Sequence, residues 1–385
     1  MLIFVGHFHK PPDDGETCYP NAGSKVQNEI IRQLRIHNKY KEFSAYVMPA
    51  GPSWPRAPVF VKTLRKKDIE YIGYPNLPIL KHLIFSIRLV GKLRGRGECA
   101  IIQYNAFLFE NITLLAVRKF IRPAKLGCIL QDVLVRLEDK SLISVMRYKI
   151  STFSIKLIRK FDLAMVIAPK LVKDFKLFDS RSFVFKGGIV DTDRLLSSHY
   201  QDRAVSTVYG TRSSAVSVFA GVLEKYNGID LLVEAWLKDE IQSTLYVYGD
   251  GSLFEHISSI CVDTNVKVMG SVPIEEVNKA LDAAAFAFCM RYSRGIDQEY
   301  FFPSKIFELL NRPIRILSNA SFIVPRDISE NIFVMEDDLS NLQEKMEEAA
   351  LQDPLDVIAK RHSLLDNKYS WEVGTRKLLK LLEVA

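Results

Sequence analysis

Short apolar segments alternate with longer amphipathic segments along the whole chain of 385 residues. Apolar runs of about four to eight residues predict buried strands, and apolar positions spaced three and four residues apart predict helices. In the first half this pattern predicts strands at residues 1–5, 44–48, 99–103, 125–130 and 163–168, with helices at residues 24–38, 80–93, 112–120 and 142–161. Alternation of this kind is typical of parallel β/α/β units.

The same alternation starts again after about residue 185. It predicts strands at residues 181–186, 215–220, 243–248, 266–269, 286–290, 314–318 and 331–334, and helices at residues 228–238, 253–259, 274–284, 304–310, 339–350 and 353–365. The polar stretch 197–214 has no clear strand pattern and separates the two series. We therefore predict an α/β fold of two doubly wound, Rossmann-like domains with a cleft between them, at residues 1–195 and 196–369. A final helix at about residues 370–385 is expected to pack back on the first domain.

The charge is distributed unevenly between these two domains. The net charge is +7, but residues 1–185 hold 31 Lys and Arg against 15 Asp and Glu, whereas the remainder holds 21 against 30. This asymmetry indicates an anionic partner for the first half, such as nucleic acid, anionic lipid or a phosphorylated substrate. A nucleic-acid binder is disfavoured, because the basic residues are not interleaved with aromatic residues and match no known module.

Cysteine usage and hydropathy favour a cytoplasmic protein. The five cysteines have no CxxC spacing, which favours buried reduced thiols over a zinc or redox site. No uncharged apolar run reaches the length of about 18 residues that a membrane span needs, and the first residues read as a strand rather than a signal peptide. Residues 81–96 alternate apolar and basic positions at helical spacing. They suit either a helix on an anionic bilayer surface or a packed helix with solvated lysines.

Candidate chemistry in the first half lies in loops that follow strands, where open α/β sheets bind ligands. His7 lies at the mouth of the first strand, and either faces an acceptor or is a surface histidine. Gly23 precedes Ser24 where a helix begins, so this end either binds an anion or is an ordinary N-cap. Asp132 follows the strand 125–130, where it is either a catalytic carboxylate or the N-cap of a helix.

Three loops or strands of the second half are candidates for binding a nucleotide, in addition to the region from Arg291 to Glu308. Gly221 ends a strand, and the nearby Lys225 either reaches a phosphate or is solvated. Gly249 lies in a Gly-Asp-Gly turn, which is either a ligand-binding loop or a purely structural turn. Val268 lies on a strand that either supports a flat base or belongs to the core.

The segment 299–308 carries the most specific pattern. Pro303 and Ser304 are favoured in a first helical turn, whose N–H groups attract anions, and Lys305 adds a positive charge. Glu308 follows one turn later, about 6 Å along the helix axis. A diphosphate at the helix end and a ribose on Glu308 fit this spacing, and Arg291 is a further candidate cation.

Together these segments resemble the retaining glycosyltransferases of the GT-B fold, specifically the large family 4. The resemblance covers about residues 181–320 and the terminal Ser370-Trp371-Glu372. The matches occur in the order found in the family, at residues 186–194, 219–230, 248–251, 268–272 and 302–308. Each match is weak by itself, and the shared order makes the resemblance specific.

The chain departs from this family at two phosphate-binding positions. Val222 stands where the family has an arginine, and Asn227 stands where it has a lysine. Lys225, Arg291 or Lys305 are the candidate replacements, and Lys305 is preferred.

The resemblance also implies catalytic positions. The first glutamate of the family's E-x7-E motif falls on Tyr300, with Glu299 one position earlier, whereas Glu308 matches the ribose-binding glutamate. Asp132 resembles the aspartate of the family's His-Asp pair, near the acceptor and the reacting carbon. Residues 191–193 read Asp-Thr-Asp, but their place in the interdomain motif argues against a metal-binding role.

The resemblance implies transfer of a sugar, with retention of configuration, from a nucleoside diphosphate sugar, with UDP preferred. The expected acceptor is a saccharide, preferably lipid-linked, in bacterial envelope polysaccharide biosynthesis such as O-antigen, capsule or lipopolysaccharide. Asp132, Glu299 and Lys305 are the expected catalytic residues, and neither a metal nor another cofactor is expected. The expected location is the cytoplasm, with peripheral attachment to the inner face of the cytoplasmic membrane as a further option. The alternatives are a degenerate, non-catalytic sugar-nucleotide-binding subunit and a sugar-nucleotide epimerase of the same fold.

Overall fold

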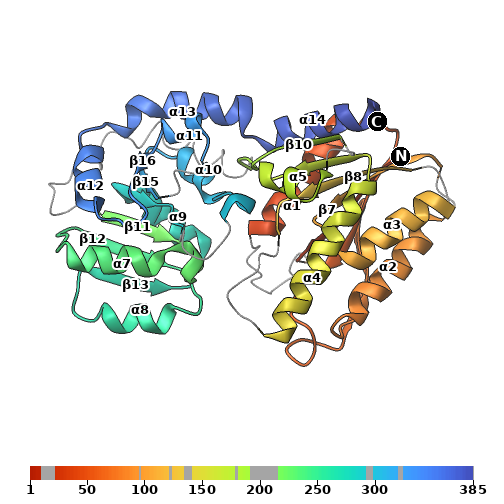
Figure 1. The fold of residues 1–385 in the computed structure, drawn as a ribbon, viewed down its shortest axis with the longest axis horizontal. Helices are drawn as coiled ribbons and strands as arrows, with labels where there is room; N and C mark the ends of the chain where they lie inside the picture. The colour runs from red at the N-terminus through yellow and green to blue at the C-terminus, as the bar shows by residue number, and fades with distance from the viewer. Residues whose placement is uncertain are drawn as a thin grey trace. The chain divides into compact units, whose positions relative to one another are not determined.

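A computed structural model shows how the chain folds (Figure 1). It describes residues 1–9, 22–94, 97–120, 124–133, 141–177, 181–190, 216–291, 298–319 and 324–384. The chain divides into two compact units, the first made of Met1–Val190, Glu299–Phe301 and Trp371–Ala385, and the second of Asp191–Gln298 and Phe302–Ser370. We call them the N-terminal and C-terminal units. The expected linker 197–214 and the Asp-Thr-Asp sequence at 191–193 lie outside the described residues.

The N-terminal unit is built on an eight-stranded sheet with the order β10-β9-β8-β7-β1-β2-β5-β4. Its strands are β1 (Leu2–Phe8), β2 (Phe43–Pro49), β4 (Leu64–Lys66), β5 (Ile69–Tyr71), β7 (Cys99–Tyr104), β8 (Ala124–Leu130), β9 (Leu163–Val166) and β10 (Arg181–Val184). All neighbouring pairs are parallel except β4 and β5. The central strand β7 is buried at every residue, because helices cover both faces of a parallel sheet.

Helices cover the two faces of this sheet differently. On one face α1 (Ala22–His37) packs against α14 (Trp371–Val384). Trp371, Leu378 and Leu382 join Phe4 and Leu34 in one buried cluster. No member of that cluster comes from α2 (Leu80–Leu93), α3 (Leu108–Phe120) or α4 (Leu142–Leu157), which lie side by side over the other face (Figure 1). The short α5 (Pro169–Asp174) connects β9 to β10.

A small two-stranded sheet was not predicted from the apolar pattern. Strands β3 (Phe60–Val61) and β6 (Tyr74–Pro75) pair antiparallel between β2 and α2. Each has only two residues, so neither can show a period of two. The hydroxyl of Tyr74 donates a hydrogen bond to the carbonyl of Pro49, which attaches this sheet to the end of β2.

The C-terminal unit contains a six-stranded parallel sheet with the order β13-β12-β11-β14-β15-β16. Its strands are β11 (Val216–Ala220), β12 (Thr244–Tyr248), β13 (Val266–Gly270), β14 (Phe286–Phe288), β15 (Arg315–Ser318) and β16 (Phe333–Val334). Its helices are α7 (Ile229–Lys238), α8 (Phe254–Ile260), α9 (Ile274–Ala283), α10 (Lys305–Leu310), α11 (Arg326–Ser329), α12 (Leu342–Ala350) and α13 (Pro354–Lys368). The strand order reverses between β11 and β14, which is the topological switch point of a doubly wound sheet.

Buried polar contacts attach α13 to the end of this sheet. The Arg361 side chain is buried and donates to the carbonyls of Ile314 (2.8 Å) and Asn331 (2.7 Å), and burial lowers the pKa of this guanidinium to about 10. At the end of α13, Asp327 of α11 accepts hydrogen bonds from Lys368 and from the hydroxyl of Tyr369 (2.9 Å). Burial alone raises the pKa of Asp327, but these hydrogen bonds outweigh it and hold the pKa below its ordinary value.

Candidate functional site

The carboxyl ends of the strands in the C-terminal unit carry the loops that the sequence singled out. Gly221 follows β11, Gly249 follows β12, and Arg291 follows closely after β14. Val268 lies within β13 and is half-buried. Because the strands are parallel, these loops emerge at the same edge of the sheet, on both sides of the switch point.

The first two loops are packed backbone against backbone. Gly249 has a φ of 135°, and a Cβ atom there would lie 1.8 Å from the carbonyl oxygen of Gly221. The Glu224 carboxylate accepts hydrogen bonds from the backbone N–H (3.0 Å) and the hydroxyl (2.7 Å) of Ser252. The glycine of the Gly-Asp-Gly turn therefore has a packing role, because no side chain fits between the two loops.

Arg291 lies at the switch point and is held from two directions. Its backbone N–H donates to the Asn319 side chain (2.8 Å), which in turn donates to the Arg291 carbonyl (2.7 Å). Its guanidinium donates to Oδ1 of Asn227, and its buried Nε has no hydrogen-bond partner among the described residues. Burial lowers the pKa of this guanidinium.

Arg291 thus brings a positive charge to Asn227, the position that is a lysine in the resembled family. Asn227 also donates to the carbonyl of Val222 (2.7 Å), so the two positions at which this chain departs from the resembled family lie in one hydrogen-bonded loop. The next residue, Gly228, has a φ of 64° and passes close to the Arg291 backbone: a Cβ there would lie 3.3 Å from its carbonyl carbon. Lys225, the other candidate in this loop, is exposed.

The segment from Phe302 to Glu308 is anchored by its aromatic residues. The rings of Phe302 and Phe307 are buried and stack with centroids 5.1 Å apart. Helix α10 begins at Lys305 and has only six residues. The N–H of Ser304 donates to the carbonyl of Phe302 (2.9 Å), and that of Ile306 donates to the carbonyl of Pro303 (3.0 Å), so these two amides already have partners.

The two charged candidates of this segment contact each other. Nζ of Lys305 lies 2.8 Å from Oε2 of Glu308, and Arg312 lies 3.6 Å from the other carboxylate oxygen of Glu308. The side chains of Lys305 and Glu308 are 31% and 23% exposed, so this ion pair is accessible to solvent. Its net stabilisation is small for that reason.

Glu299 and Tyr300 belong to the N-terminal unit, unlike Glu308. Glu299 lies 3.3 Å from Nζ of Lys170 in α5, and the hydroxyl of Tyr300 donates to Asp174 at the end of the same helix. The spacing of residues within the segment 299–308 did not indicate that its first residues belong to a different unit from Glu308.

Asp132 follows β8 and is positioned by Asn105. The side-chain carbonyl of Asn105 accepts hydrogen bonds from the N–H groups of Gln131 and Asp132, both at 3.0 Å, and its amide donates to the Asp132 carboxylate (2.8 Å). Asn105 has a φ of 60°, a left-handed conformation that asparagine tolerates better than most residues. The Asp132 carboxylate therefore has a fixed position at a strand end.

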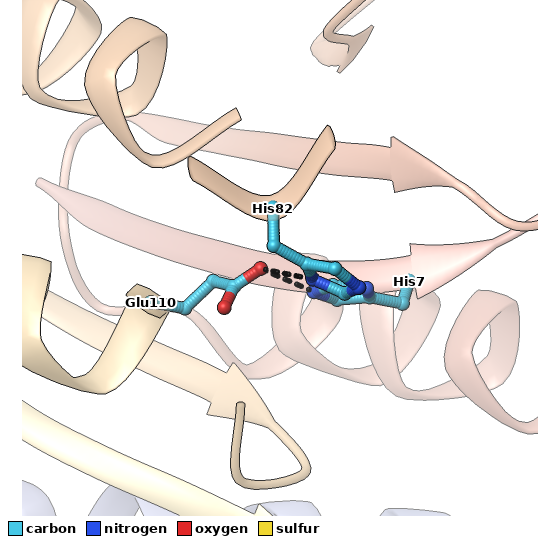
Figure 2. Close-up of side chains that lie close together, drawn as sticks. All are labelled: His7, His82 and Glu110. Atoms are coloured by element: carbon cyan, nitrogen blue, oxygen red, sulfur yellow. Dashed lines mark hydrogen bonds and ion pairs between the residues drawn. The ribbon is translucent and has the colours of Figure 1, made fainter. Parts of the chain in front are cut away.

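At the end of β1 the structure brings together three residues that lie far apart in the sequence (Figure 2). Nε2 of His7 and Nδ1 of His82 lie 3.4 Å and 3.1 Å from the same carboxylate oxygen, Oε1 of Glu110. Burial lowers the pKa of His7. Burial alone raises the pKa of Glu110, but its contacts with the two histidines outweigh it and hold the pKa at about 2.

The sequence indicated only His7 of this cluster. His82 lies in the segment interpreted as a basic amphipathic helix, and Glu110 is the one acidic residue in the first turn of α3. The available sequence signal was a lone glutamate within an otherwise apolar stretch, which the structure shows to be fully buried. Gly23, the other candidate near this loop, lies in the first turn of α1.

Comparison with known proteins identifies the fold. No family model matches the chain, and no curated protein matches it. Among solved structures, α,α-trehalose-phosphate synthase from Burkholderia xenovorans has a TM-score of 0.65 at 10% identity, over 99% of both chains. Sucrose-phosphate synthase from Thermosynechococcus elongatus has a TM-score of 0.65 at 12% identity, over 100% of this chain and 98% of that one. HepE of Anabaena, solved in complex with UDP, has a TM-score of 0.62 at 14% identity over 100% of both chains.

The chain has the GT-B fold. The predicted fold class, an α/β protein with two Rossmann-like domains, is confirmed. At identities of 10–14%, the similarity shows the architecture.

Proposed function

We propose that this chain is a glycosyltransferase that moves a sugar from a nucleoside diphosphate sugar, preferably a UDP-sugar, to a saccharide acceptor. The proposal rests on the position of Arg291, whose half-buried guanidinium lies at the switch point of the C-terminal sheet. Ligands of doubly wound sheets bind at that point. The GT-B fold and the UDP bound in the HepE structure support a nucleotide of this kind.

In this proposal Arg291 binds the diphosphate, with Lys305 and Lys225 as further cations. Arg291 is placed first because its partner Asn227 leaves its cationic charge uncompensated, whereas Lys305 already faces Glu308. Glu308 accepts hydrogen bonds from the ribose hydroxyls. The N–H groups of Ser304 and Ile306 have local partners, so the side chains carry more of the binding than the sequence suggested.

The proposed reaction is a transfer with retention of configuration. The bond between the anomeric carbon and the diphosphate oxygen breaks, and the acceptor oxygen forms its new bond on the same face. The departing diphosphate takes the proton of the acceptor hydroxyl. Arg291 and Lys305 stabilise the negative charge that develops on the diphosphate, without a metal ion at this step. Asp132 and Glu299 are assigned to the acceptor and the transferred sugar.

We also propose that the acceptor is linked to a lipid, in envelope polysaccharide assembly at the inner face of the cytoplasmic membrane. None of the helices in the described part of the chain is long and apolar enough to cross a membrane. Helix α4, however, exposes an apolar stripe at helical spacing, formed by Leu142, Met146, Ile150 and Phe153. Basic side chains flank the stripe at positions 147, 149 and 156. Apolar and basic residues together suit an anionic bilayer surface.

Donor binding tests the first part of the proposal. Calorimetric titration of the full chain with UDP, GDP and ADP is expected to give measurable binding for UDP and weaker binding for the other two. In a second assay the purified protein is incubated with acceptor extracts and each of a panel of UDP-sugars. We expect it to release UDP from at least one of these donors. A chain that binds no nucleotide diphosphate contradicts the proposal. A chain that binds UDP but neither hydrolyses nor transfers from any donor is instead a non-catalytic subunit.

Vesicle sedimentation tests the membrane surface. Met146→Glu and Phe153→Glu are expected to reduce binding to vesicles of anionic phospholipid, since each places a charge on the apolar stripe. Ile36→Glu is the matched control, because Ile36 is similarly exposed (58%) but lies on α1. Equal binding by all three variants would refute the assignment of α4.

A further inference from the structure

We propose that His7, His82 and Glu110 form a binding site for a first-row divalent transition metal of the zinc class, in the N-terminal unit. The three residues come from β1, α2 and α3, and one potential ligand atom of each lies within 4.8 Å of the other two. Figure 2 shows both imidazole rings directed at the same carboxylate. None of these residues belongs to the loops assigned to the donor.

The distances suit tetrahedral coordination. Zinc bonds of about 2.0–2.1 Å to imidazole nitrogen and carboxylate oxygen place neighbouring ligands about 3.3 Å apart. Glu110 Oε1 lies 3.4 Å from His7 Nε2 and 3.1 Å from His82 Nδ1, so one distance is slightly longer and the other slightly shorter than this separation. One ligand atom of each histidine also lies within 4.8 Å of the other, so shifts of the two rings would admit an ion between the three residues.

Unpaired buried atoms point to a missing ligand. Glu110 is fully buried, and its second oxygen, Oε2, forms no hydrogen bond with any described residue. His7 Nε2 is also buried without a hydrogen bond in suitable geometry. A buried carboxylate is costly unless it is paired or coordinates a metal. No Lys or Arg of the described residues forms an ion pair with Glu110, and the adjacent Lys81 donates to the carbonyl of Gly51 (3.3 Å) instead.

The surrounding residues hold the ligands in place. The backbone of His7 exchanges two hydrogen bonds with the Gln27 side chain, at 2.9 Å and 2.7 Å. The His7 ring stacks on Phe107, with centroids 3.9 Å apart and planes inclined by 17°. Support of this kind keeps first ligands in the orientation that a metal requires.

The site has one side open to solvent. The His82 side chain is 25% exposed, compared with 11% for His7 and 0% for Glu110. Three protein ligands with one open position are typical of zinc sites that keep a water or substrate oxygen in the fourth position. The site thus differs from a closed structural zinc site with four protein ligands.

Metal titration of the untagged, chelator-stripped full chain tests the proposal. We expect one equivalent of Zn²⁺ to bind with a dissociation constant of about 1 µM or lower. Co²⁺ in its place should give a visible absorption band of a four-coordinate nitrogen and oxygen site. His82→Ala and Glu110→Gln should each weaken zinc binding by more than the about 10–100-fold that loss of an outer partner costs. His256→Ala is the control, because His256 is exposed on α8 and should leave the titration unchanged.

Each outcome decides the matter. If wild-type protein binds no zinc, the three residues form a hydrogen-bonded group only and the proposal is overturned. It is also overturned if zinc binds but His82→Ala binds it as tightly as wild type. Should Glu110→Gln fail to fold, as judged by circular dichroism, the result for His82→Ala decides alone. The titration needs no sugar donor, so its result is independent of the proposed transferase activity.

Discussion

Arg291→Ala is the sharpest test of the proposed donor site. Arg291 follows β14, its backbone is tied to Asn319, and its guanidinium contacts Asn227. The substitution removes the guanidinium but leaves the backbone hydrogen bonds to Asn319 intact. The loop should therefore keep its conformation, and the effect should fall on nucleotide binding rather than on folding.

The contacts of the Arg291 guanidinium determine how much Arg291→Ala should weaken UDP binding. The half-buried guanidinium has five N–H donors, and its side chain donates only to Asn227 among the described residues, so at least one charge-assisted hydrogen bond remains for a diphosphate. Loss of a hydrogen bond to a charged group costs about 1.5–3 kcal/mol. At about 1.4 kcal/mol per tenfold change, Arg291→Ala should raise the dissociation constant for UDP by about 10- to 150-fold. Arg291→Lys should recover only part of this loss, because it keeps the charge but not the planar fork.

Isothermal titration with UDP measures the effect, with thermal unfolding as a check on folding. Arg326→Ala is the matched control, because that side chain is 92% exposed in α11 and pairs only with Glu330 among the ion pairs described. It should leave UDP affinity unchanged. If Arg291→Ala changes the UDP dissociation constant by less than about threefold, as the control does, the guanidinium does not bind the diphosphate.

Two further predictions concern stability, measured by denaturant or thermal unfolding. Asp327→Asn should lower the free energy of unfolding by about 1.5 kcal/mol at neutral pH. The substitution removes the charged acceptor of the hydrogen bonds from Lys368 and from the hydroxyl of Tyr369. The folded pKa of Asp327 lies below the ordinary 3.8, so its stabilisation is complete above about pH 4 and is lost as pH falls through the folded value. The gap between wild type and variant should then narrow in acid, and a constant gap would argue against this hydrogen-bonded carboxylate. Gly249→Ala should cost about 3 kcal/mol or more, since the new Cβ meets the Gly221 carbonyl at positive φ. Gly91→Ala, in open space on α2, should be stabilising by about 0.5–1 kcal/mol, and similar behaviour of the two variants would refute the packing argument.

Much of the fold could be predicted from the apolar pattern. Strands β1, β7, β8 and β9 are near-continuous apolar runs because both faces of a parallel sheet are covered, and this makes them recognisable without tertiary information. The two-residue strands β3 and β6 were missed because they are too short to show a period. Helix α2 was correctly located, but its pattern did not show that His82 contacts Glu110, because the partner residue lies 28 positions away.

The candidate site was predicted unevenly for the same reason. The sequence by itself determined which strands end in glycine loops, and it showed that Val222 and Asn227 stand where the resembled family has an arginine and a lysine. Only the tertiary structure decided that Arg291 reaches Asn227, since the strand order places β14 beside β11. It also decided that Glu299 packs on α5, and that two histidines and a glutamate from three separate elements meet at one point. Periodicity reports which face of an element is buried, whereas side-chain partners depend on how elements far apart in the chain are placed together.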